Sequence, residues 1–163
     1  MKKIILTLCV AAGLVSCTSE ADQKAKLGAA NMAFYTRVFD VAVNEGRTDI
    51  FDSAYVDDAV LHTVPEVKGK VNAKAYYSNY VTGFSERQFI VKEMFADGDK
   101  LVKHWQFKGK HTGSFFGIPA TGKTVDVIGC TIAKMKDGKI AEEQDFMDNM
   151  VFMQQLGLLP AAQ

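Results

Sequence analysis

The chain has 163 residues, of which 48% are hydrophobic, and its 19 basic and 19 acidic residues give a formal net charge of zero. This length and apolar content indicate one globular domain, and they exclude a disordered protein, a collagen-like fibre and a multi-span membrane protein. The absence of a basic excess argues against a nucleic-acid-binding protein, because such proteins need positive charge to meet phosphates.

The first residues have the pattern of an export signal. The basic start Met1-Lys2-Lys3 precedes an apolar run over residues 4–15 that is too short to cross a bilayer as a helix. Leu14-Val15-Ser16-Cys17 resembles the lipobox of bacterial lipoproteins. We therefore expect a lipoprotein signal peptide at residues 1–16 and acyl chains on Cys17, with a plain secretory signal as the alternative.

This signal predicts a location in the bacterial cell envelope, with the chain anchored to a membrane by lipid and its domain in the periplasm or outside. Residues 17–30 would then hold the lipidated cysteine and a polar tether, and residues 31–160 the domain.

The first half of the domain favours helices. Apolar residues recur at helical spacing from about residue 25 to a stop signal at Gly46, and Asp49 is predicted to cap a short helix that ends at Ala54. A strand and then a further helix follow, over residues 59–63 and 71–81.

The second half favours strands. Asp97-Gly98 and Asp137-Gly138 are hairpin turn signals, each between two alternating segments. Helices followed by a curved antiparallel sheet predict an α+β domain with its helices on one face. The predicted strands cover residues 89–95, 101–111, 124–136 and 139–147, and a short amphipathic segment covers 150–156.

Residues 117–124 match the P-loop formula G-x-x-x-x-G-K-[ST]. A P-loop needs a helix that begins at its lysine, so that backbone N–H groups point at phosphates. The residues after Lys123 are instead β-branched and alternating, which favours a strand. We therefore reject nucleotide binding at this segment.

Three ordered motifs give this segment another interpretation: Gly113-Ser-Phe-Phe-Gly-Ile-Pro-Ala-Thr-Gly-Lys-Thr-Val125, Asp137-Gly-Lys-Ile140 and Gln154-Gln-Leu-Gly-Leu-Leu-Pro160. Together they resemble the SnoaL-like polyketide cyclase (ester cyclase) family over residues 31–160. The resemblance implies a cone-shaped fold like that of nuclear transport factor two, in which a curved sheet wraps around N-terminal helices and a deep apolar pocket. It also implies an intramolecular aldol ring closure on a polyketide ester, without a cofactor.

Such a closure needs a base that removes a proton next to a carbonyl group. The resemblance implies that this base is Asp145, eight residues beyond the aspartate of the Asp-Gly turn; the alternative is a solvated residue in an acidic run. The family's partner histidine falls on Thr131, which can donate a hydrogen bond but cannot act as an acid at neutral pH. The short turn predicts that residues 131 and 145 lie opposite each other on one face.

The three histidines are possible substitutes for that partner. His62 ranks first, because it lies near a family pocket position, and His111 ranks second, because it precedes the glycine-rich loop. His104 ranks third, since an odd separation places it on the opposite strand face from His111. No spacing of ligands suggests a metal site, and we expect neither a metal nor another cofactor.

Aromatic residues can supply the walls of the pocket. We expect a substrate-binding role for the side chains of Tyr76, Tyr80, Trp105 and Phe146, and Asp148 is predicted to cap the last helix rather than to act in catalysis. The leading hypothesis is a lyase, isomerase or cyclase acting on a small apolar carbonyl compound. A small-molecule-binding lipoprotein of the same fold is the second, and a self-associating module that forms a homodimer is the third.

Overall fold

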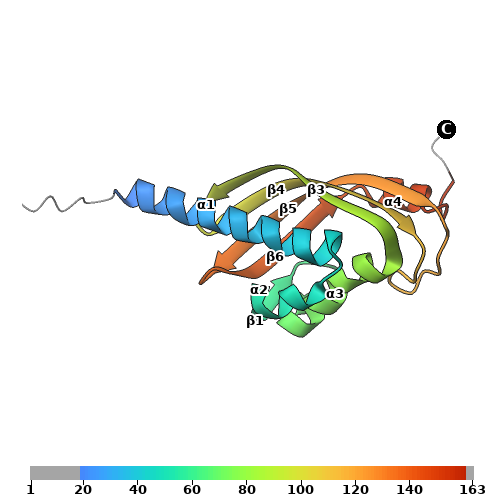
Figure 1. Cartoon of the computed structure of the whole chain (residues 1–163), viewed down its shortest axis with the longest axis horizontal. Helices are drawn as coiled ribbons and strands as arrows, with labels where there is room; N and C mark the ends of the chain where they lie inside the picture. Colours follow the sequence, from blue (N-terminus) through green and yellow to red (C-terminus); the bar gives the residue numbers. More distant parts are fainter. Residues whose placement is uncertain (1–18, 161–163) are drawn as a thin grey trace, which may run out of the picture.

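The computed structural model describes residues 19–160, so the predicted signal peptide and Cys17 lie outside the described residues. The described chain folds as helices followed by a six-stranded sheet (Figure 1), which confirms the α+β fold class. In this part of the chain, no helix has the length and apolar character needed to span a membrane.

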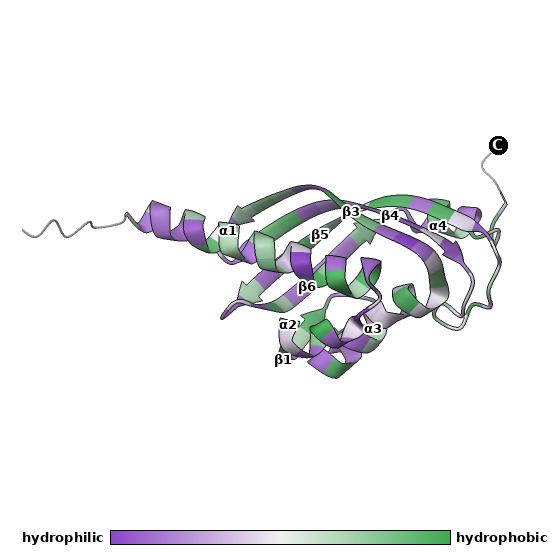
Figure 2. Cartoon of the chain, viewed as in Figure 1, coloured by the Kyte–Doolittle hydropathy of each residue, from purple (hydrophilic) through white to green (hydrophobic). Residues whose placement is uncertain are grey.

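A long helix, α1 (Glu20–Phe39), opens the described chain. It begins earlier than the sequence pattern predicts, because Ser19 and Asp22 form a capping box there. Most of the predicted tether is therefore helical. The first turns are hydrophilic and extend beyond the sheet (Figure 2), whereas the later turns carry the buried side chains. A π-helical turn, η1 (Asp40–Asn44), continues the helix to the predicted stop at Gly46, where φ is 75°.

Short elements connect α1 to the sheet. A 3₁₀ turn, η2 (Thr48–Ile50), leads into α2 (Phe51–Ala54), so Asp49 lies inside the turn rather than at the N-cap, and that prediction is wrong. Strand β1 (Tyr55–Leu61) begins before the predicted start, and the next loop contains a strand that the sequence pattern did not predict, β2 (Val67–Lys68). Helix α3 (Lys70–Gly83) follows, close to its predicted bounds.

The four long strands match the two predicted hairpins, although β3 begins five residues before its predicted start. They are β3 (Phe84–Asp97), β4 (Lys100–His111), β5 (Thr124–Lys136) and β6 (Lys139–Met147).

The strand order is β2-β1-β6-β5-β4-β3. All neighbours are antiparallel except β1 and β6, which pair in parallel and so depart from the predicted all-antiparallel sheet. The extra length of β3 includes a shift in register between Ser85 and Gln88, with a positive φ at Glu86. Such bulges bend a strand and increase its twist, so this irregularity contributes to the curvature of the sheet.

The end of the chain closes one end of the sheet. Helix α4 (Asn149–Gln155) is capped by Asp148, whose carboxylate accepts a hydrogen bond from the Val151 amide over 3.0 Å, as predicted.

The residues after Lys123 form strand β5 and not a helix, which confirms that the P-loop match is accidental.

The core lies between the concave face of the sheet and helices α1 to α3 (Figure 1). Along β4 and β5, buried and exposed side chains alternate, so every second residue points toward the helices. Polar residues at these inward positions are consequently shielded from bulk water. The inward positions of β4 and β5 therefore provide side chains for the candidate site.

Candidate active site

Asp145 lies on β6 and is paired directly with Thr131 on β5, as the turn geometry predicts. The Thr131 hydroxyl donates a hydrogen bond to Oδ1 of Asp145, and the Tyr77 hydroxyl donates to Oδ2 over 3.0 Å. The indole Nε1 of Trp105 donates in turn to the Thr131 hydroxyl over 2.9 Å. The carboxylate is therefore held in one orientation by groups from a strand and a helix, a form of preorganisation that proton transfer requires.

Two adjoining hollows meet at this carboxylate, since the side chains of Asp145 and Tyr80 line both of them. The inner cavity is small, with a volume of about 30 Å³, which leaves room for a water-sized group. The outer cleft opens beside the loop after β1 and has a volume of about 630 Å³, which is within the range of small-molecule sites. The inner walls are mainly aromatic and comprise Phe39, Val43, Tyr77, Tyr80, Phe89, Lys103, Trp105 and Phe107.

Glu143 lies two residues before Asp145 on the same face of β6, and only 1% of it is exposed. Its two carboxyl oxygens accept hydrogen bonds from the hydroxyl groups of Tyr35 on α1 and Tyr55 on β1. Burial, followed by the nearby charge of Asp145, raises the pKa of Glu143 to about 7. Glu143 is therefore protonated in a large fraction of molecules at neutral pH.

Lys103 projects from β4 into the same interior and is 2% exposed. Its Nζ lies 4.5, 4.0 and 4.8 Å from the ring centroids of Tyr35, Phe39 and Phe89. Burial lowers the pKa of Lys103 to about 8, against the opposing charges of Asp145 and Glu143. The ammonium form is stabilised by the aromatic rings around it and remains the main form at neutral pH.

The family model for SnoaL-like polyketide cyclases matches residues 32–156, which is most of the chain. The protein belongs to the SnoaL-like polyketide cyclase family. It is 26% identical over 121 residues to the aklanonic acid methyl ester cyclases DnrD of Streptomyces peucetius and DauD of Streptomyces sp. strain C5. These matches cover 71% of this chain and 83% and 75% of the two relatives.

Solved structures share the fold of this SnoaL-like chain. A candidate SnoaL-like polyketide cyclase from Jannaschia sp. CCS1 superposes with a TM-score of 0.73 at 25% identity, covering 82% of this chain and 96% of the other. TsrD from Streptomyces laurentii gives the same TM-score and identity, with coverages of 80% and 97%. An epoxide hydrolase from M. tuberculosis matches at 17% identity with a TM-score of 0.61, so its likeness is one of fold alone.

Several residues that the sequence predicts for the site lie together around Asp145. Thr131 donates a hydrogen bond to the Asp145 carboxylate, and Trp105 donates one to the Thr131 hydroxyl. Tyr80 lines both hollows, and Tyr76 lines the outer cleft. The structure thus brings five of the predicted residues into one region.

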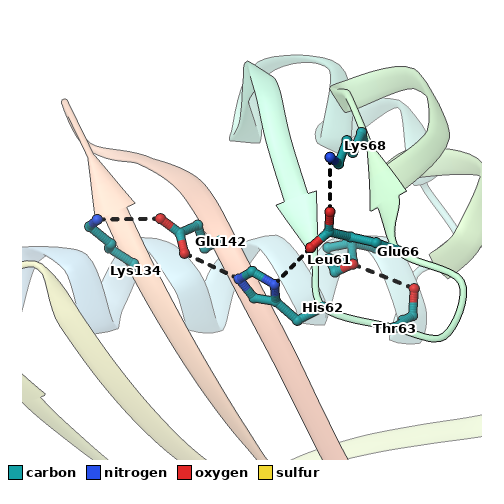
Figure 3. Close-up of polar contacts among 7 residues, drawn as sticks. All are labelled: Leu61, His62, Thr63, Glu66, Lys68, Lys134 and Glu142. Atoms are coloured by element: carbon teal, nitrogen blue, oxygen red, sulfur yellow. Dashed lines mark hydrogen bonds and ion pairs between the residues drawn. The ribbon is translucent and has the colours of Figure 1, made fainter.

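His62 stands at the rim of the outer cleft, immediately after β1. Its ring lies between two carboxylates, with Nδ1 3.2 Å from Glu66 and Nε2 3.2 Å from Glu142 (Figure 3). Lys68 and Lys134 extend this chain of charges on either side (Figure 3). Both ring nitrogens are therefore engaged in surface contacts, which indicates a structural role for His62 at the rim.

The other predicted residues lie outside the two hollows. His111 is buried against Phe84 and Phe115, with Nδ1 3.1 Å from the Thr121 hydroxyl. Phe146 follows Asp145 on the strand, so it points to the convex face and is 48% exposed. Neither residue is part of the site around Asp145.

Sequence reasoning missed Lys103, Glu143 and Tyr77. The signal for the first two was present, because Lys103 alternates with Leu101 and Trp105, and Glu143 shares the strand face of Asp145. Their partners come from α1 and β1, which no local pattern connects to these strands. Among residues 19–160, no group of three or more His, Cys, Asp or Glu side chains is placed to hold a metal ion.

Proposed function

We propose that this protein is a cofactor-independent acid–base enzyme, a cyclase, isomerase or lyase, that acts on a small apolar carbonyl compound with Asp145 as its base. One observation supports this above all. Asp145 is the only carboxylate that lines the inner cavity, and it lies where that cavity meets the outer cleft, among the described residues.

The contacts of Asp145 fit the task of a base. Thr131 and Tyr77 each donate one hydrogen bond to it, which fixes the carboxylate but leaves further lone pairs toward the hollows. A substrate that entered through the outer cleft could place an acidic C–H group against these oxygens. The same carboxyl group would return the proton to another atom of the product, so that no co-reactant is consumed.

The walls of the outer cleft and the inner cavity define the kind of substrate. Aromatic and aliphatic side chains form most of both surfaces, and they favour a neutral apolar molecule over a highly charged one. The two relatives named as aklanonic acid methyl ester cyclases make that ester the first compound to test. Simple enolisable ketones and esters such as ethyl acetoacetate extend the panel.

The test is the exchange of substrate C–H groups for deuterium, followed by NMR, together with product analysis by mass spectrometry. Asp145→Asn should lower the rate by about 10³-fold, as expected for loss of a general base. Glu142→Gln is the matched control, because it neutralises a carboxylate on the same strand that contacts His62 instead. An Asp145→Asn protein with wild-type activity would remove Asp145 from the mechanism.

The second candidate function is a small-molecule-binding protein without catalysis. Thr131 favours it, because this hydroxyl stands where the resemblance places a protonatable histidine, and it is already committed to Asp145 and Trp105. Tight binding of a ligand that is released unchanged, with equal affinity for wild type and Asp145→Asn, would support this function. Detected turnover would refute it.

We also propose that Cys17 is acylated and anchors the protein in the bacterial cell envelope. The lipobox-like sequence before Cys17 supports this proposal. Mass spectrometry of the mature chain should find acyl chains on the N-terminal cysteine, and Cys17→Ser should release the protein from the membrane fraction. An unmodified N-terminus at another residue would favour the plain secretory signal.

A homodimer through the convex face of the sheet is a further proposal. Five large apolar side chains on this face are exposed, namely Phe95, Val102, Ile128, Ile132 and Phe146. Light scattering should find a dimer, which Ile128→Lys should dissociate. A monomer at all concentrations would refute this assembly.

A further inference from the structure

Lys103 lies in one row with Thr131 and Asp145 across three neighbouring strands. The register pairs Lys103 with Thr131 between β4 and β5, and Thr131 with Asp145 between β5 and β6. Neighbouring strands are about 4.8 Å apart, so the backbones of Lys103 and Asp145 are separated by about 10 Å. Both side chains line the inner cavity, which makes them two walls of the same space.

The ammonium group of Lys103 has hydrogen-bonding capacity left over. It has three N–H donors, and it makes one long hydrogen bond, of 3.5 Å, to the Tyr35 hydroxyl. The three aromatic rings around it attract its charge but accept no conventional hydrogen bond. Lys103 forms no ion pair with any carboxylate of residues 19–160.

A buried cation in this state is suited to an oxygen atom that becomes negative. Burying a charge is costly unless it is paired, and in an apolar cavity an incoming oxyanion would interact with the ammonium far more strongly than in water. Burial also lowers the pKa of Lys103 only to about 8, so the charge is available at neutral pH.

We propose that Lys103 binds the carbonyl oxygen of the substrate and stabilises the oxyanion that forms when Asp145 removes a proton from the neighbouring carbon. This inference rests on the proposed function and adds a second catalytic residue to it. The C–H electron pair becomes the new C=C bond, and the C=O π pair moves to the oxygen held by Lys103. The proton resides on Asp145 until the next step returns it.

The substrate class follows from the positions of Lys103 and Asp145 on two walls of the inner cavity. A neutral ketone or ester enters without a charge penalty and becomes anionic only between Lys103 and Asp145. A substrate with a permanent negative charge would be repelled by Asp145 on the way in, because this carboxylate also lines the outer cleft. The site is therefore built for a neutral enolisable carbonyl compound.

The test uses 4-nitrophenol, whose coloured phenolate resembles an enolate, and needs no turnover. It is carried out with the full chain in the Asp145→Asn background, in which residue 145 can neither repel the phenolate nor take the proton of the neutral phenol. Binding is followed by quenching of Trp105, which is the only tryptophan and lines the cavity. Ionisation of the bound phenol is followed by its absorbance.

We expect the Asp145→Asn protein to bind the phenolate, and the added substitution Lys103→Met to weaken this binding at least about tenfold, as loss of a charge-assisted hydrogen bond requires. Methionine is apolar and similar in length, so the packing among the rings is kept. A second measurement needs no change at Lys103: phenolate binding should fall as the pH rises through the pKa of Lys103, which Asp145→Asn moves below its wild-type value of about 8 because the charge of Asp145 is gone.

Equal phenolate affinity with and without Lys103 would overturn the proposal, and so would the absence of any binding that quenches Trp105. The proposed function fails by a different result. If Asp145→Asn keeps full turnover while phenolate binding depends on Lys103, the base is wrong and the oxyanion site stands. If turnover is lost but phenolate binding ignores Lys103, the base stands and Lys103 has no such role.

Discussion

The buried carboxyl group of Glu143 makes the stability of the fold depend on pH, and Glu143→Gln measures that dependence. In the folded protein its pKa is raised from 4.5 to about 7, chiefly by burial and then by the charge of Asp145. Because the folded pKa is the higher one, the stabilising contribution is fully present below pH 4.5 and is lost as the pH rises through 7.

The shift corresponds to about 3 kcal/mol, and no discount for solvent is needed because Glu143 is 1% exposed. Glutamine stays neutral and can accept a hydrogen bond from one tyrosine while donating to the other. Urea unfolding, followed by Trp105 fluorescence, should therefore show the wild type losing about 3 kcal/mol relative to Glu143→Gln between pH 4.5 and pH 7.

Glu142→Gln is the control, since hydrogen bonds from His62 and Lys134 lower the pKa of this half-exposed neighbour. The contribution of Glu142 to the free energy of unfolding should be small, and it should grow rather than fall as the pH rises. Wild-type and Glu143→Gln curves that run parallel from pH 4.5 to pH 7 would refute the reasoning, because Glu143 would then keep the same pKa in the folded and unfolded chain.

Three further predictions concern local structure. The hydrogen bond to Glu142 is the main cause that raises the pKa of His62. His62→Ala should therefore lower the stability of the fold below the ordinary histidine pKa of 6.5 and change it little at higher pH. Because the side chain is 40% exposed, the loss measured in thermal melts should stay under about 1 kcal/mol. Asp148→Ala removes the cap of α4 and should lower the free energy of unfolding by about 1 kcal/mol in urea, whereas no change would mean that the cap is not formed in solution. Gly129→Ala would place a Cβ 2.3 Å from the Trp105 ring, so it should destabilise the protein by about 1–3 kcal/mol and shift the tryptophan emission; an unchanged melting temperature would contradict this packing.

The sequence predicted those parts of the fold that depend on local rules. A short Asp-Gly turn determines the register of the strands on either side, so the pairing of Thr131 with Asp145 follows from the sequence alone. The cap at Asp148 followed in the same way from its place before an amphipathic segment. Strand alternation also explains why Phe146 and Asp145 point in opposite directions, although the prediction placed Phe146 in the pocket.

The remaining features depend on contacts between distant segments. The parallel pairing of β1 with β6 joins elements from opposite ends of the domain, and no local signal specifies it. His62 was ranked first because it lies near a family pocket position, and no local pattern indicates that carboxylates from a loop and a distant strand hold both sides of its ring. Glu143 stands in an acidic run of the sequence, and its buried position depends on contacts with Tyr35 and Tyr55, which come from α1 and β1.

The charges of the interior explain why only one of the two inward carboxylates of β6 is suited to be the base. One buried ammonium group, on Lys103, lies near two carboxyl groups, that of the buried Glu143 and that of Asp145, which is exposed at the outer cleft. Burial, and then the charge of Asp145, raise the pKa of Glu143 to about 7. Glu143 is capped by two tyrosine hydroxyls and lines neither hollow, whereas Asp145 reaches both. The carboxyl group that a substrate can touch is thus that of Asp145, and the ammonium group of Lys103 lies on the facing wall of the inner cavity.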